Sequence, residues 1–308
     1  MNSICIFGVF VADLCFFGKK IPERGETILG NNHLVGPGGK GSNQAIAAAR
    51  LEGKVNFITK VGKDNHADMA FSLYKEAGVN VESISQDNNL STGVAGIMID
   101  EDGNNAINVF AGAAAHLQNI DIDKNLDVIK DSKIFLTQME TPDLTTMYAL
   151  KKAKENNCLT ILNPAPARKI QKEDFSLLDF FTPNETEAEF YLNKKIETKE
   201  DIQNAAKAIL SVLPLDSFLV SQGKSAVCRM EVDEKPQELL ESHREFIKVV
   251  KEVSGSNWKV GSIERQAFYE EAKKSFAIVT TTDARPFSCF IMTKGVIKPD
   301  GNVWVLDK

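Results

Sequence analysis

The chain has 308 residues, 43% hydrophobic and 25% charged, a composition typical of an ordinary globular protein. Its formal net charge of −6 and pI near 5.4 provide no basic field for nucleic acid or an acidic membrane surface. The five cysteines and four histidines show no metal-ligand spacing, so we expect free thiols in a reducing compartment. No segment has the length of a membrane span, and we expect a cytoplasmic protein without nucleic-acid or membrane partners.

Short apolar runs alternate with helical segments along the chain. The first run, residues 4–7, ends at Gly8 and is typical of a strand buried on both faces. Further strands are predicted at residues 55–61, 133–137, 159–162, 180–182 and 218–220. Helices are predicted at residues 65–77, 142–156, 185–191 and 199–212. This alternation predicts an α/β fold with a parallel sheet and helices on both faces.

Residues 26–35 and 94–110 also have strand character. The second segment is interrupted at residues 100–105, Asp-Glu-Asp-Gly-Asn-Asn, which is a strong signal for a hairpin turn. Beside this turn, Ile97, Ile99, Ile107 and Val109 alternate with smaller or polar neighbours. Strands of this kind have an apolar face that needs cover.

The most informative stretch is residues 36–45, Gly-Pro-Gly-Gly-Lys-Gly-Ser-Asn-Gln-Ala, which leads into a run of strong helix formers. Glycines permit a tight turn and close approach to a ligand, and the helix would direct its free N–H groups at that ligand. Lys40 and Asn43 add a charge and polar groups at the same place. Together they suit a polyhydroxylated or anionic small molecule.

Two general motifs fit this stretch poorly. The spacing of Gly36, Gly38 and Gly41 matches the dinucleotide fingerprint, but that fingerprint belongs directly after the first strand of its unit. The phosphate-binding loop ends in Gly-Lys-Ser or Gly-Lys-Thr, whereas Lys40 is followed by Gly41. From the residues alone, a glycine turn without a ligand stays open.

Several polar residues come directly after predicted strands: residues 38–43, Glu140, Asn163, Asn184 and Glu187. Because ligands gather at the carboxyl ends of parallel strands, this placement predicts one shared crevice. Each acidic or amide group also has a structural interpretation. Asp13 could be a turn residue, and Glu140, Asn184 and Glu187 could be helix caps.

Residues 38–45, Gly-Gly-Lys-Gly-Ser-Asn-Gln-Ala, resemble the sugar-binding signature of the ribokinase branch of the PfkB carbohydrate kinases. Other segments resemble that family in the same order: residues 25–27, 61–64, 91–93, 163–167 and 183–189. The resemblance covers residues 4–226 and implies a ribokinase-like domain at residues 1–226. It implies that strands at about residues 14–40 and 92–111 form a small β lid over the sugar and a possible homodimer contact.

The resemblance also implies the site. The substrate would be ribose or a related pentose, bound by Asp13, Gly39, Lys40, Gly41, Asn43 and Glu140. ATP and Mg²⁺ are the implied cofactors, with nucleotide contacts from Asn184, Glu187, Ser221 and Gly223 and a metal contact from Glu187. The chain departs from the family at Val11, where a polar residue is usual, and keeps only the first glycine of the nucleotide turn.

The catalytic motif of the family, Asp-Thr-x-Gly-Ala-Gly-Asp, is absent from residues 227–308. In the family its glycines hold the migrating phosphoryl group and its last aspartate takes the proton from the sugar hydroxyl. Loss of a general base costs about 10²–10⁴ in rate, and loss of an anion cradle about 10²–10³. We therefore assign no catalytic residue, expect no monovalent-cation site, and expect kinase turnover to be impaired.

The tail resembles a second family. Residues 263–279 and 294–297 resemble the end of the fucose mutarotase and ribose pyranase family, which implies a half-domain at residues 227–308 with its junction within 209–227. Residues 263–275 have the pattern of an amphipathic helix that leads into a strand at 276–280. Where that family carries a tyrosine the chain has Phe287, although Arg265 and Tyr269 remain.

The sequence therefore leaves three functions open. The first is an ATP-dependent pentose kinase by ancestry, and the second is a non-catalytic sugar-binding protein. The third is a mutarotase-type isomerase completed by another subunit. An erroneous join in the coding sequence near residues 209–227 would produce the same pattern.

Overall fold

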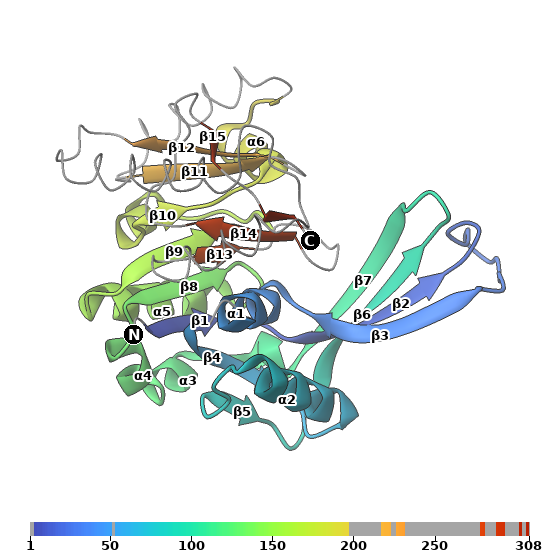
Figure 1. The fold of residues 1–308 in the computed structure, drawn as a ribbon, viewed down its shortest axis with the longest axis horizontal. Helices are drawn as coiled ribbons and strands as arrows, with labels where there is room; N and C mark the ends of the chain where they lie inside the picture. Colours follow the sequence, from blue (N-terminus) through green and yellow to red (C-terminus); the bar gives the residue numbers. More distant parts are fainter. Residues whose placement is uncertain are drawn as a thin grey trace, which may run out of the picture.

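The computed structural model describes residues 3–50 and 53–196 and, beyond them, the backbone of six strands within residues 217–307 (Figure 1). The helices are α1 (Lys40–Arg50), α2 (Asn65–Ala77), α3 (Asn119–Asp123), α4 (Leu126–Lys130), α5 (Asp143–Glu155) and α6 (Glu185–Leu192), with 3₁₀ turns η1 (Ala113–His116) and η2 (Lys172–Leu177). The strands are β1 (Ser3–Phe7), β2 (Val11–Phe17), β3 (Asn32–Gly38), β4 (Lys54–Val61), β5 (Ile84–Gln86), β6 (Thr92–Ile99), β7 (Asn105–Gly112), β8 (Ile134–Gln138), β9 (Leu159–Asn163), β10 (Phe180–Phe181), β11 (Ser217–Gln222), β12 (Ala226–Glu231), β13 (Ile278–Thr280), β14 (Ser288–Met292), β15 (Asn302–Val303) and β16 (Leu306–Asp307).

The main sheet has the spatial order β15-β12-β11-β10-β9-β8-β1-β4-β5 among the described strands. Every neighbouring pair from β11 to β5 runs parallel, while β12 and β15 are antiparallel additions at one edge. The predicted parallel sheet is therefore confirmed. Each predicted strand of this sheet overlaps an observed one.

The two faces of the sheet bury alternate residues of the same strands. Ile4 and Ile6 of β1 pack in one buried cluster with side chains of α1 and α2. Cys5 and Phe7 pack in a second cluster with side chains of α3, α4, α5 and α6. Because successive strand residues point to opposite faces, the continuous apolar run of β1 needs helices on both sides. This confirms the predicted covering of both faces.

A second sheet, with the order β3-β2-β6-β7, projects from the body as a lid (Figure 1). The predicted hairpin between β6 and β7 is confirmed, because the Asp100 carboxylate accepts hydrogen bonds from the N–H groups of Asp102 and Asn104. Gly103 has φ 82°, a conformation that glycine adopts without strain. The predicted lid segments at residues 14–40 and 92–111 correspond to this sheet.

The strand predicted at residues 26–35 is placed wrongly by the sequence. The observed strand β3 begins at Asn32 and ends at Gly38. Its position is set by antiparallel pairing with β2, which runs from Phe17 opposite Asn32 to Val11 opposite Gly38. Residues 18–31 form the connection between these strands, and local propensity alone did not locate its end.

The lid exposes large apolar side chains, seven of which are at least 38% accessible: Phe16, Leu34, Val35, Met98, Ile107, Val109 and Phe110. By contrast, Ile97 is buried at 6% in a small cluster with Val11 and Ala95. The expected alternation therefore holds on β6, but the apolar residues Ile107 and Val109 of β7 face solvent. Large apolar side chains exposed in such number are uncommon on monomeric proteins.

Some predictions lie outside the described residues. These are the helix at 199–212 and the amphipathic helix at 263–275 with the residues after it, apart from the strands named above. The strand predicted at 276–280 overlaps β13. No prediction covered α3, α4 or β5, because elements of three to five residues are too short to show a periodicity.

The expectation of free thiols is confirmed for Cys5, Cys15 and Cys158, which form no disulfide. Burial raises the pKa of the Cys5 and Cys158 thiols, so both stay protonated and unreactive at neutral pH. Within the described part of the chain, no helix combines the length and apolar character that crossing a membrane requires.

Candidate functional site

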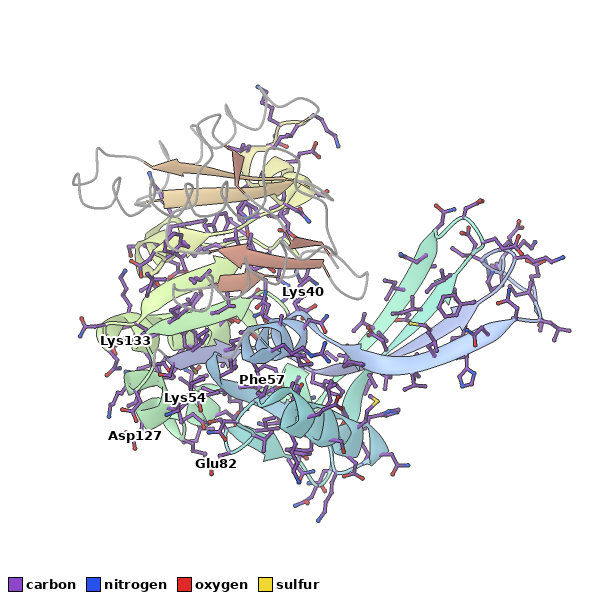
Figure 2. The ribbon with its side chains drawn as sticks, viewed as in Figure 1. Lys40, Lys54, Phe57, Glu82, Asp127 and Lys133 are labelled. Atoms are coloured by element: carbon purple, nitrogen blue, oxygen red, sulfur yellow. The ribbon has the colours of Figure 1, made fainter. Side chains whose placement is uncertain are left out.

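The polar residues predicted to share a crevice lie at the carboxyl edge of the main sheet. Figure 2 shows Lys40 where α1 begins, beside the root of the lid. Lys54 and Lys133, which mark the amino ends of β4 and β8, lie toward the opposite side of the body (Figure 2). The strand ends therefore place the candidate site between the sheet and the lid.

The glycine stretch makes the turn from β3 into α1. Gly39 has φ 87°, and a Cβ atom there would overlap the carbonyl oxygen of Val9. The same carbonyl accepts the N–H of Ser42 at 3.2 Å, which binds the first turn of α1 to the segment after β1. Only glycine allows this approach. Gly41 is also a packing position, because a Cβ atom there would lie 2.7 Å from the Cα of Gly8.

Glu140 joins the end of β8 to the start of α1. Its carboxylate accepts the Lys40 side chain at 2.7 Å and the Lys40 backbone N–H at 2.8 Å. Both side chains are partly exposed, Lys40 at 29% and Glu140 at 19%. The Glu140 carboxylate thus accepts a hydrogen bond from the first backbone N–H of α1. A negative charge is favourable at this end of a helix. Glu140 therefore caps α1 and not α5, the helix that follows it in the chain, which has no side-chain cap.

Asp13 lies on β2, opposite Gly36 of β3, and its carboxylate fills the space where a Cβ of Gly38 would be. Burial, reinforced by the nearby charge of Glu140, raises the pKa of Asp13 to about 6. Within the described residues no hydrogen bond uses the Asp13 carboxylate. The structure therefore brings Asp13, Lys40 and Glu140 together and leaves a carboxylate available to a ligand.

Asn43 belongs to the same turn of α1. Its backbone N–H donates to the carbonyl oxygen of Gly39 at 2.9 Å, and the residue is half-buried. In the described part of the chain its side-chain amide makes no hydrogen bond. Asn43 therefore has a side-chain donor and acceptor that the described residues do not use, about one helical turn after Lys40 on α1.

Asn184 and Glu187 form a capping box at the start of α6. The Asn184 side chain accepts the N–H of Glu187 at 2.8 Å, and the Glu187 carboxylate accepts the N–H of Asn184 at 2.9 Å. The capping interpretation of both residues is therefore confirmed, and Glu187 is 6% exposed. They follow β10, farther along the same edge than Glu140.

The remaining predicted contacts belong to the end of the chain. Ser221 lies on β11, the strand that pairs in parallel with β10 beside the capping box. Gly223 lies outside the described residues. Among the described residues, no group of three histidine, cysteine or acidic side chains is arranged to hold a metal ion. Glu187, the residue predicted to contact Mg²⁺, is buried, and its carboxylate accepts the N–H of Asn184.

Sequence reasoning gave no role to two buried glutamines of this region. Gln44 of α1 and Gln138, the last residue of β8, are 0% and 1% exposed, and their side-chain amides are hydrogen-bonded to each other. Gln44 was visible as part of the glycine stretch. Gln138 carries no sequence signal, because its partner is 94 residues away in the chain.

The architecture is a ribokinase-like α/β fold. It combines a parallel main sheet, a projecting four-stranded lid and, between them, an edge that carries acidic groups and the glycine turn. Ribokinase from Arabidopsis thaliana, complexed with ribose and ATP, superposes with a TM-score of 0.70 at 25% identity and covers 89% of this chain and 92% of that one. Ribokinase from Thermotoga maritima superposes with a TM-score of 0.67 at 27% identity, covering 87% and 90% of the two chains.

The chain belongs to the pfkB family of carbohydrate kinases, whose family model matches residues 1–241. Ribokinase from Haemophilus influenzae is 35% identical over 226 residues, which are 73% of this chain and 74% of that protein. Deoxyribokinase from Salmonella typhimurium is 32% identical over 234 residues, 76% of each chain.

Proposed function

We propose that this protein binds ribose or a related pentose at the carboxyl edge of its main sheet. The contacts come from Asp13, Gly39, Lys40, Gly41, Asn43 and Glu140. The convergence of Asp13, Lys40 and Glu140 from three separate segments carries the proposal. Relatives named ribokinase and deoxyribokinase support a pentose over other small molecules.

The chemistry of these groups suits a sugar. Ionised Asp13 can accept hydrogen bonds from two hydroxyl groups, and the Asn43 amide can both donate and accept. A hydrogen bond to a charged group contributes about 1.5–3 kcal/mol, so three such bonds are sufficient for measurable affinity. Gly39 allows the tight turn that brings the start of α1 to this edge, because a Cβ atom there would overlap the carbonyl oxygen of Val9.

ATP and Mg²⁺ would bind next to the sugar. Two related ribokinases were solved with ATP or ADP, which supports a nucleotide here. Asn184, Glu187, Ser221 and Gly223 are the proposed contacts, and Mg²⁺ would neutralise charge on the phosphates. In this chain the first turn of α1 orients the sugar, and Glu140 fixes the ammonium group of Lys40.

We expect sugar binding to be retained while phosphoryl transfer is slow. The glycine-rich motif and final aspartate of the family are absent from residues 227–308, which removes the general base and the anion cradle. A calorimetric titration with ribose should therefore give heat, whereas ADP release with ribose and Mg-ATP should be at least about 10²-fold slower than for a ribokinase. No heat and no thermal shift with ribose would contradict the proposal, and fast ADP release would contradict its second half.

Two other functions remain for the same chain. A non-catalytic sugar-binding protein would give heat with ribose but no ADP above background. A mutarotase-type isomerase would accelerate exchange between sugar anomers in NMR spectra, and this would assign a role to the residues at 227–308. Sequencing the transcript across residues 209–227 would test whether the join is genuine.

We also propose that the exposed side chains of the lid pair two copies of the chain. Replacing Val109, which is 56% exposed, with aspartate would place a charge in that apolar surface. Light scattering should then show the mass of a dimer for the parent and of a monomer for Val109→Asp. Leu144→Asp is the matched control, because Leu144 is 86% exposed on α5, which is not part of the lid sheet. A monomeric parent would end this proposal.

A further inference from the structure

The pair Gln44–Gln138 links the same two elements as the ion pair Lys40–Glu140. Gln138 Nε2 donates a hydrogen bond to Gln44 Oε1, and both residues are fully buried. Gln44 lies one helical turn after Lys40 on α1, and Gln138 lies two residues before Glu140. A buried amide contact and a partly exposed ion pair thus both join α1 to the end of β8. We call the two glutamines the amide clamp.

The space around the amide clamp is closely fitted. A Cβ atom on Gly41 would lie 3.0 Å from Gln138 Oε1, and one on Gly8 would overlap the same oxygen. The Gln138 side chain therefore lies against the end of β1 and the first turn of α1 at once. Glycine at both positions is what leaves room for the amide.

Stability does not explain the amide clamp. The second polar atom of each side chain, Gln44 Nε2 and Gln138 Oε1, makes no hydrogen bond among the described residues. A buried polar atom without a partner costs free energy, whereas replacing both partners with apolar groups of the same shape is nearly neutral or stabilising. An amide-to-amide hydrogen bond does, however, favour one geometry where an apolar contact tolerates several. Buried polar groups in some proteins act in this way.

We propose that Gln44 and Gln138 are positioning residues for the sugar site. The amide clamp fixes the first turn of α1 against the end of β8. With α1 held in this position, the Glu140 carboxylate accepts both donors of Lys40. The side chain of Asn43 is then placed to bind the sugar. This inference rests on the proposed pentose site and adds to it two residues that do not touch the sugar.

The test replaces both glutamines with methionine, which has nearly the same shape but no hydrogen-bonding amide. The variant Gln44→Met/Gln138→Met should unfold at the same temperature as the parent or above it, and its dissociation constant for ribose should rise about tenfold to a hundredfold. The matched control is Asn56→Leu/Asn80→Leu, which removes another amide pair, Asn80 Nδ2 to Asn56 Oδ1 at 3.0 Å. Asn56 pairs with Cys5 in the middle of β1, away from the carboxyl edge. The control should alter the unfolding temperature without altering ribose affinity.

An unchanged affinity in the folded methionine variant would overturn the inference. A second measurement tests the inference without ribose. It compares the change in unfolding temperature that Glu140→Gln causes in the parent with the change that it causes in the methionine variant. Glu140→Gln should lower the unfolding temperature less in the methionine variant than in the parent, because α1 no longer holds Lys40 in position to pair with Glu140. Equal shifts would overturn the inference. If the parent itself fails to bind ribose, the sugar proposal falls, and this comparison still tests the amide clamp.

Discussion

Replacing Glu140 with glutamine is expected to weaken ribose binding about tenfold to a hundredfold. The Glu140 carboxylate now holds two donors of Lys40, at 2.7 Å and 2.8 Å. A glutamine keeps one acceptor and turns an N–H group toward the other donor, so the ammonium of Lys40 loses its fixed position. The expected factor corresponds to the loss of one charge-assisted hydrogen bond, about 1.5–3 kcal/mol.

The same substitution should lower the free energy of unfolding by about 1 kcal/mol, because the ion pair is partly exposed and screened by solvent. Titration calorimetry and thermal unfolding measure the two effects. Glu155→Gln is the matched control, since it removes an ion pair with Lys152 on the surface of α5. Equal ribose affinity in Glu140→Gln and the parent would exclude Glu140 from the site.

Replacing Asp13 with asparagine is expected to weaken ribose binding by a similar factor while making the protein more stable. Burial and the charge of Glu140 raise the pKa of Asp13 to about 6, so the ionised carboxylate is unfavourable in the folded protein. In the unfolded chain the pKa of aspartate is about 4. Ionisation of Asp13 therefore lowers the free energy of unfolding as the pH rises from about 4 through about 6. Asparagine carries no such cost, and we expect a gain of about 1–2 kcal/mol at pH 7.5 after allowance for solvent screening.

The pH dependence provides a sharper form of this test. The ribose affinity of the parent should fall as the pH drops from 7 to 5, because protonated Asp13 accepts fewer hydrogen bonds. The affinity of Asp13→Asn should change little over this range. Asp127→Asn is the control, because Asp127 lies on α4 at the far side of the body (Figure 2). A parent affinity that is constant from pH 5 to 7 would contradict a raised pKa at Asp13.

Elements that are specified by neighbouring residues could be predicted from the sequence. Helix α2 begins and ends where predicted, because Asp64 caps its first turn by accepting the N–H of Ala67 at 3.0 Å. Gly78 ends the same helix in the left-handed conformation, with φ 83°. The parallel strands were likewise visible as short apolar runs, since burial on both faces leaves a continuous pattern.

The sequence also determined that Glu140, Asn184 and Glu187 stand at the carboxyl edge, since each comes shortly after a strand in the chain, whereas Asp13 lies within β2. Only the tertiary structure decided what those groups do to one another. The contact between Lys40 and Glu140 spans 100 residues, and the contact between Gln44 and Gln138 spans 94. The start of β3 at Asn32 was likewise set by pairing with β2. The physical reason is common to all three: local propensity fixes the conformation of a short segment, whereas partners and electrostatic environment depend on which segments the sheet order brings side by side.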